Sequence, residues 1–122
     1  MQIIAIHNET HPKPRPIQAH HCRSFWCRLR GLMLRSRLEP YEGLLMVEPI
    51  ESRTNASIHM FFMRFPLCVV WFDRSCRVVG TALALPWRPY YAPPAPAKYI
   101  LETHPDRIDD FTVGDQLVLQ NA

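Results

Sequence analysis

Leu67-Cys68-Val69-Val70-Trp71-Phe72 is apolar at every position. A strand with one face in water alternates apolar and polar residues, whereas a strand covered on both faces does not. We therefore expect a central, buried strand here, the alternative being a face that meets a partner. Asp73-Arg74-Ser75-Cys76 then forms a tight connection into a second strand over Arg77–Leu85, which predicts a β-hairpin.

Short apolar runs bounded by turn residues surround this hairpin. They predict further strands over Gln2–Ile6, Leu44–Val47, Ile58–Met63, Tyr99–Glu102 and Gln116–Gln120. Polar residues predict a loop over Glu48–Ser57. Eight of the 12 prolines lie within Pro12–Pro16 and Pro86–Pro96. Because proline neither continues a helix nor donates to a strand ladder, both segments are predicted loops.

A helix is expected over Ser24–Met33. Ser24 is a suitable N-cap, and apolar residues recur at helical spacing on one stripe, whose members are Phe25, Leu29, Leu32 and Met33. Gly31 lies near the expected end, where a left-handed residue often stops a helix. The sequence thus predicts one mainly β domain over residues 1–122, a compact sandwich or barrel of short strands with one short N-terminal helix.

Composition and charge exclude several classes of function. The 4 glycines form neither G-x-G-x-x-G nor G-x-x-x-x-G-K-[ST], so neither common phosphate-binding loop is present. The net charge of +3 is small for a dedicated nucleic-acid binder. The N-terminus carries no leader-like pattern, and no segment is long enough to span a bilayer. We expect a cytoplasmic chain with free thiols and no membrane span.

The four cysteines, Cys22, Cys27, Cys68 and Cys76, suggest neither a metal site nor a disulfide in the hairpin. His20-His21-Cys22 with Cys27 lacks the second half of a zinc-binding pattern. In the predicted hairpin, the cysteines at 68 and 76 lie on the order of 17 Å apart, well beyond the reach of a disulfide. We expect no metal and no cofactor.

The order of several motifs resembles a known family. The chain reads Arg28-Leu29-Arg30-Gly31-Leu32-Met33, then Ile58-His59-Met60-Phe61-Phe62-Met63-Arg64-Phe65-Pro66-Leu67, and later Val113-Gly114-Asp115. From about Ile6 to Leu119 it is similar to the prokaryotic "domain of unknown function 192" family, also called uncharacterised protein family 0127. The resemblance implies a mainly β, sandwich-like domain with a short N-terminal helix, and implies no particular activity.

Two positions depart from this family pattern. Relatives usually carry an acidic residue where this chain has Cys68, so a family site built on that acid would be altered here. Relatives usually carry Gly where this chain has Cys76, in the hairpin turn. A side chain at that position weakens the prediction of a type I′ turn, because a Cβ resists positive φ.

Candidate binding residues occur at the predicted strand over Ile58–Met63 and in the second proline-rich loop. His59 and Arg64 flank the aromatic run at 60–63, and the second proline-rich loop contains Trp87, Arg88, Tyr90 and Tyr91. Aromatic residues beside an arginine suit stacking on a base, a sugar or a protein side chain. The alternative is that they fold back and close one end of the molecule.

These observations predict a non-catalytic binding or accessory module for an unidentified ligand or protein partner. No complete catalytic constellation can be assembled from the residues. One alternative is a small hydrolase-like enzyme with a pocket near His59 and Cys68, on the neighbouring predicted strands. Another is weak phosphate or nucleic-acid binding through the basic stretch 13–37, with Arg23 and Arg30 on one helix face.

Overall fold

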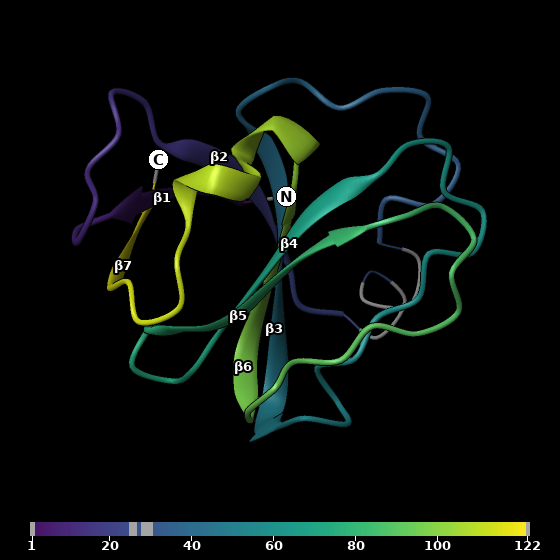
Figure 1. Ribbon diagram of the computed structural model, residues 1–122. Coiled ribbons are helices and arrows are strands. Elements are labelled where there is room, and N and C mark those ends of the chain that lie inside the picture. Colours follow the sequence, from purple (N-terminus) through teal and green to yellow (C-terminus); the bar gives the residue numbers. More distant parts are fainter. Residues whose placement is uncertain (1, 25–26, 28–30, 122) are drawn as a thin grey trace.

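The computed structural model describes residues 2–24, 27 and 31–121. Within this part of the chain the elements follow one another as seven strands and one short 3-10 helix (Figure 1). They are β1 (Ile3–Asn8), β2 (Ile17–Cys22), β3 (Glu42–Ser52), β4 (Leu67–Phe72), β5 (Val78–Ala84), β6 (Ala97–Thr103), η1 (Pro105–Asp110) and β7 (Leu117–Asn121). No helix among the described residues is long and apolar enough to cross a membrane.

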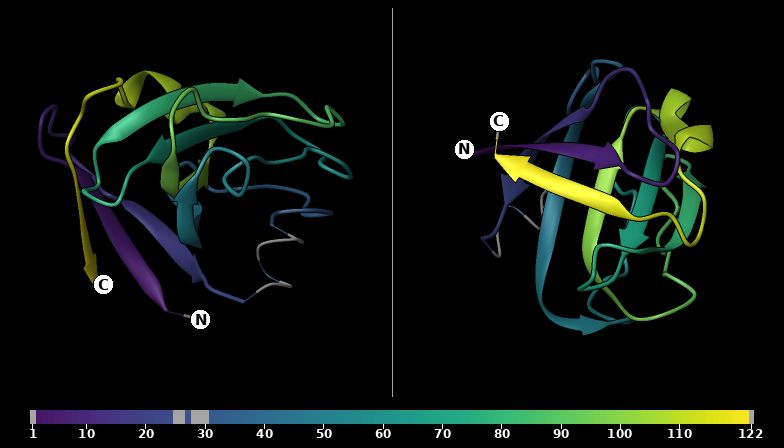
Figure 2. Two further views of the ribbon diagram at one scale, coloured as in Figure 1. Left: turned by 90° about the horizontal axis from the view of Figure 1, so that it is seen from below. Right: turned by 90° about the vertical axis from the view of Figure 1, so that its left-hand side faces the viewer.

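The strands form one curled sheet in the order β5-β4-β6-β3-β2-β1-β7. The β2–β3 pair is parallel, and every other neighbouring pair is antiparallel. Figure 2 shows the sheet arching so that its two ends approach one another. They touch where Arg77, just before β5, bridges Gln116, just before β7. The sheet is therefore a half-barrel, closed at one corner and open elsewhere.

The central strand β4 divides the core in two. All six of its residues are buried, which confirms the prediction of a strand covered on both faces. Leu67, Val69 and Trp71 belong to one hydrophobic cluster. Cys68, Val70 and Phe72 belong to the other. This alternation is the period-2 geometry of a strand.

The first cluster is covered by connecting segments rather than by a second layer of regular structure. Leu32, Leu38, Met60 and Met63, all from loops, pack into it. We call this side of the sheet the loop face. It is covered by three loops, residues 31–41, 53–66 and 85–96, which gather at the right of Figure 1. The second cluster contains Phe111 and is covered by η1 and the segment that follows it.

Gly80 shows how closely the second proline-rich loop covers the loop face. A Cβ at this position would lie 2.5 Å from Cδ of Pro94 and 3.5 Å from Cε3 of Trp71. A side chain at Gly80 would force the loop away from β5, since atoms essentially never approach so closely. The prolines of segment 86–96 thus hold it against the sheet, with no regular secondary structure.

The helix predicted over Ser24–Met33 is not shown. Phe25 and Leu29 lie outside the described residues, and Leu32 and Met33 lie in turns. What the structure does show is local: Ser24 Oγ accepts a hydrogen bond from the N–H of Cys27 at 3.0 Å, as an N-cap does.

Two other predicted segments were wrong and one strand was missed. Ile58–Met63 is not a strand, because only Ile58 pairs, through an isolated bridge to Tyr91. The predicted loop over Glu48–Ser57 begins later, since β3 continues to Ser52. Strand β2 was missed because IQAHHC mixes polar and apolar residues too evenly to stand out.

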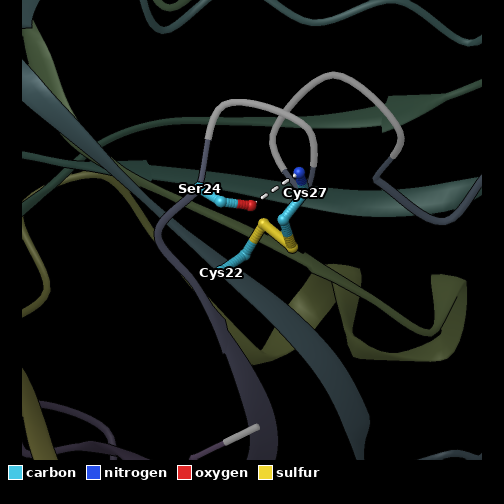
Figure 3. The surroundings of a disulfide bond; sticks show 3 residues. All are labelled: Cys22, Ser24 and Cys27. Atoms are coloured by element: carbon cyan, nitrogen blue, oxygen red, sulfur yellow. Dashed lines mark hydrogen bonds between the residues drawn. A yellow bond between two sulfur atoms is a disulfide. The ribbon is translucent and has the colours of Figure 1, made fainter.

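Cys22 and Cys27 form a disulfide with their Cα atoms 5.6 Å apart (Figure 3). The expectation of free thiols was therefore wrong for this pair. Its sulfurs are bonded to each other and unavailable as thiolate ligands. Cys68 and Cys76 carry free thiols, as expected. Cys68 lies opposite Leu83 in the hairpin, well along the strand from Cys76 in the turn.

Candidate functional site

A cavity of about 350 Å³ lies on the loop face, between the sheet and the loops that cover it. Its volume falls within the range of about 300–1,000 Å³ that small-molecule sites occupy. Strands β3 and β6 form its floor. The lining residues are Gly31, Leu32, Met33, Met46, Glu48, Pro49, Asn55, Ser57, Ile58, His59, Met63, Ile100 and Glu102.

The pairing of β3 with β6 places the floor residues. Met46 lies opposite Ile100, and Leu44 lies opposite Glu102. Because side chains alternate across a strand, Met46 and Glu48 share one face of β3, while Ile100 and Glu102 share the same face of β6. Leu45 and Leu101 point the other way, into the second cluster. Regular strand geometry thus places Glu48 and Glu102 on the largely apolar floor of the cavity.

Glu102 is the most unusual residue of this floor. Glu102 is only 4% exposed, yet none of the described residues donates a hydrogen bond to its carboxyl or forms an ion pair with it. Burial raises the pKa of Glu102 to about 7. At neutral pH this carboxyl is therefore poised to accept or to donate a hydrogen bond, depending on what enters the cavity.

Gly31 allows the neighbouring loop to approach this carboxyl. A Cβ at Gly31 would lie 3.4 Å from Oε1 of Glu102, and the glycine has φ +52°. Its N–H donates to the carbonyl of Cys27 at 2.8 Å. Cys27 is tied to the end of β2 by its disulfide with Cys22. The disulfide therefore fixes the segment that forms one wall of the cavity.

Further polar groups line the cavity besides Glu102. Glu48 is buried, and its carbonyl accepts from Nζ of Lys98 at 2.7 Å. Ser57 Oγ donates to the carbonyl of Thr54 at 2.6 Å, which orders the loop that also contributes Asn55. Sites for organic ligands usually combine such an apolar lining with a few placed polar groups.

Among the candidates that the structure describes, His59 is the one that lines this cavity. Its Nδ1 accepts from the N–H of Phe61 at 3.2 Å, and the two rings lie 5.4 Å apart. Cys68, by contrast, is fully buried in the second cluster, on the opposite side of the sheet. Burial, reinforced by Asp110, raises the pKa of the Cys68 thiol to about 12. A pocket combining His59 with Cys68 is therefore wrong, because the sheet separates them.

The remaining candidates lie on the loops beside the cavity. Trp87, Arg88 and Tyr90 are exposed, as is Arg64 on the neighbouring loop. Tyr91 is different: it forms a two-residue bridge with Ile58 and accepts a hydrogen bond at its hydroxyl from the N–H of Leu85 at 2.9 Å. Tyr91 thus joins two loops, which is the structural alternative that the sequence left open.

The phosphate site expected in the basic stretch near the N-terminus stays a prediction, because the structure does not describe both of its arginines. Arg23 is exposed, and Arg30 lies outside the described residues. Arg35 forms a forked ion pair with Glu42 at 3.0 Å, and Arg37 pairs with Glu39. Two of these cations are thus already neutralised by carboxylates.

A second buried polar cluster closes the turn before β7. Asp115 accepts hydrogen bonds from Nδ2 of Asn8 at 2.7 Å and from the N–H of Thr112 at 2.9 Å, and it contacts Nδ1 of His11 at 2.8 Å. Burial alone would raise the pKa of Asp115, but these hydrogen bonds lower it overall. The cluster is fully satisfied and serves to lock the turn onto the start of the chain.

Glu102 and Glu48 were missed from the sequence. Tyr99-Ile100-Leu101-Glu102 was correctly predicted as a strand, but a glutamate at its end looks like an ordinary solvent-exposed terminus. The available signal was that Glu102 lies on the same face of its strand as the apolar Ile100. That face is seen to be buried only once the pairing of β3 with β6 is known.

Comparison with solved structures finds the same fold in proteins of low sequence identity. A crystal structure of a protein from Sinorhizobium meliloti, provisionally described as a transcription regulator, aligns with a TM-score of 0.82 at 16% identity, over 97% of this chain and 92% of the other. A protein of unknown function from Novosphingobium aromaticivorans aligns with a TM-score of 0.80 at 19% identity, over 95% and 83% of the two chains. These likenesses show the fold alone.

Comparison of sequences finds archaeal relatives. A UPF0127 protein of Pyrococcus furiosus is 38% identical over 90% of this chain and 93% of its own length. A UPF0127 protein of Thermococcus sibiricus is 43% identical over 77% of this chain, and this chain spans 60% of that protein's length. A third, from Thermococcus gammatolerans, is 47% identical over 65% of this chain and 50% of its own length.

The DUF192 family model, described as "Uncharacterized ACR, COG1430", matches residues 5–119. This range includes every strand but the first two residues of β1 and the last two of β7. It contains all the residues that line the cavity on the loop face. The resemblance inferred from the sequence motifs is confirmed, and the chain belongs to the uncharacterised DUF192, or UPF0127, family.

Proposed function

We propose that this protein is a non-catalytic binding module whose ligand is a small organic molecule held in the cavity on the loop face. The observation that carries the proposal is Glu102, a buried carboxyl aimed into that cavity with no hydrogen-bonding partner among the described residues. A carboxyl removed from bulk water without a protein partner costs stability, which supports a role for Glu102 in holding a ligand.

The chemistry of the cavity points to a ligand with two parts. Met46, Met63 and Ile100 offer an apolar surface, and thioether side chains adapt readily to irregular shapes. Glu102 suits a group that donates hydrogen bonds, above all an ammonium or guanidinium, because a cation favours the ionised carboxylate. The preferred ligand is therefore a small amine or guanidine with an apolar body.

The test uses matched probes that share a body and differ in charge. Phenethylamine, phenylethanol and phenylpropionate are added to the protein while its melting temperature is measured. We expect the amine to raise the melting temperature more than the alcohol, and the carboxylate to have no effect, since ligands that bind only the folded state stabilise it. Butylguanidine should behave as the amine does.

Two variants make the test specific to the cavity. Glu102→Gln keeps the shape of the side chain but removes its charge, and it should abolish the preference for the amine. Glu9→Gln removes an exposed carboxyl on a distant loop and should leave the preference unchanged. Equal responses to amine, alcohol and carboxylate in the natural protein would contradict the proposal.

A further inference from the structure

Six large apolar side chains project from the three loops that cover the loop face. They are between 40% and 64% exposed. We call them the crown, which consists of Leu34, Phe61, Phe62, Leu85, Trp87 and Tyr90. Soluble domains seldom gather so many exposed large apolar side chains in one place without using them for an interaction. None of these six lines the cavity described above, so the crown is a separate feature.

Direct contacts hold the three loops of the crown together. The N–H of Leu34 donates to the carbonyl of Phe62 at 3.0 Å, and the N–H of Trp87 donates to the carbonyl of Met60 at 2.6 Å. The rings of Phe62 and Trp87 lie 5.0 Å apart. The loops run side by side at the right of Figure 1, so the crown is one surface rather than scattered residues.

The backbone of the crown is strained where its side chains project. Leu34, Phe62 and Trp87 have φ values of +66°, +63° and +69°, in the left-handed region that residues with a Cβ avoid. Strain of this kind tends to persist at functional sites. In the crown, the strained residues have exposed side chains, so packing of the interior does not account for the strain. The strain therefore points to a use at the surface.

Two of the three crown loops, residues 53–66 and 85–96, carry positive charge and no negative charge, and on the third Glu39 is paired with Arg37. Arg64 and Arg88 are exposed on two of its three loops. No Asp or Glu occurs anywhere in residues 52–72 or 74–101. Among the described residues, neither arginine pairs with a carboxylate. A partner that complements this surface is apolar and negatively charged.

We propose that the crown is a membrane-docking surface that inserts its aromatic side chains into the interface of a bilayer containing anionic phospholipid. Tryptophan, tyrosine and phenylalanine favour the headgroup level, and arginine is attracted to anionic lipid. The crown residues project from loops, whereas an apolar peptide would need a groove or a free strand edge to receive it. A bilayer accepts projecting side chains without one.

The experiment measures sedimentation of the protein with vesicles of phosphatidylglycerol or of phosphatidylcholine. We expect binding to phosphatidylglycerol that weakens with added salt, weaker binding to phosphatidylcholine, and a blue shift of tryptophan emission on binding. Trp87→Gly and Phe62→Gly suit the left-handed backbone and remove only the side chain. Each should weaken binding about tenfold, as expected for losing a large apolar contact.

Two further variants separate the contributions. Arg64→Gln with Arg88→Gln should remove the preference for phosphatidylglycerol while leaving the weak binding to phosphatidylcholine. Ile50→Ser, which removes an exposed apolar side chain outside the crown, should bind as the natural protein does. Absence of vesicle binding, or binding that Trp87→Gly leaves unchanged, would overturn the proposal. So would self-association in light scattering that Trp87→Gly abolishes, because the occupant would then be a second copy.

Discussion

The backbone of Gly31 lies so close to the carboxyl of Glu102 that a Cβ at residue 31 would come within 3.4 Å of Oε1. This contact joins the loop fixed by the Cys22–Cys27 disulfide to the floor of the cavity. The R-x-x-G-L-M motif places a glycine here because the position needs a left-handed backbone, with φ +52°. A Cβ at 3.4 Å from the carboxyl would be in ordinary van der Waals contact with it.

We expect Gly31→Ala to lower the free energy of unfolding through backbone strain and to place a methyl group against the carboxyl of Glu102. Gly114 provides the matched control, since it has φ +98° and nothing lies within 4 Å of its would-be Cβ. Gly114→Ala should cost about 1 kcal/mol through strain. Gly31→Ala should cost that amount and also reduce the response to phenethylamine. Urea denaturation measures the loss of stability, and an amine response that stays unchanged would show that the contact with Glu102 is unimportant.

Glu102 should make the stability of the fold depend on pH. Because burial raises its pKa from an ordinary 4.5 to about 7, the folded state binds a proton more tightly than the unfolded state. The stability contributed by the neutral carboxyl is fully present below pH 4.5 and is lost as the pH rises through about 7. The difference between these limits is about 3 kcal/mol.

Glu102→Gln should remove this contribution, since the amide does not titrate. Its free energy of unfolding should no longer fall as the pH rises from 5 to 8, and it should exceed that of the natural protein at pH 8. Urea denaturation of both proteins across this range measures the difference. Parallel pH profiles for the two proteins would contradict the assignment.

The four cysteines should differ sharply in their reaction with iodoacetamide. Cys68 is fully buried, and its pKa is raised to about 12, so it should react only after denaturation. Cys76 is partly exposed, although burial and Asp73 raise its pKa, so it should react slowly in the native protein. Cys22 and Cys27 should react only after reduction. Peptide mass spectrometry identifies each labelled site. Rapid labelling of Cys68 in the native protein would contradict its burial and support the alternative of a catalytic cysteine.

The hairpin turn offers a test of local strain. Cys76 has φ +63°, and its N–H donates to the carbonyl of Asp73 at 2.8 Å, so it occupies the left-handed position that follows a type I turn. Cys76→Gly should raise the free energy of unfolding by about 0.5–1 kcal/mol by relieving this strain. Ser75→Gly, at an exposed neighbour without positive φ, should lower it. Equal losses in both variants would show that the cysteine is not strained.

The sequence revealed the parts of the fold that depend on local pattern. The buried strand at 67–72 and its hairpin partner were predictable, because an unbroken apolar run and a polar turn leave little choice. The strand predicted over residues 58–63 was wrong. Its apolar and aromatic residues are typical of a strand, but here they pack a loop and form part of the crown. Strand β2 depends on pairing between segments far apart in the sequence, which local pattern does not encode.

The candidate site was predictable only in part, for the same reason. His59 was singled out from its unusual neighbours, and it does line the cavity. Glu102 gains its meaning from the pairing of β6 with β3 and from the approach of Gly31, neither of which a single segment reveals. The Cys22–Cys27 disulfide likewise follows from how the chain turns after β2, and not from the spacing of the cysteines.

The most direct test of the central claim is to follow the carboxyl carbon of Glu102 by NMR during a pH titration. We expect a pKa of about 7 in the free protein, well above the ordinary 4.5, and a fall in this pKa when phenethylamine binds. An ordinary pKa in the free protein would contradict this expectation, because the carboxyl would then be hydrated or paired. An elevated pKa that no amine lowers would show a buried glutamate without a role in binding.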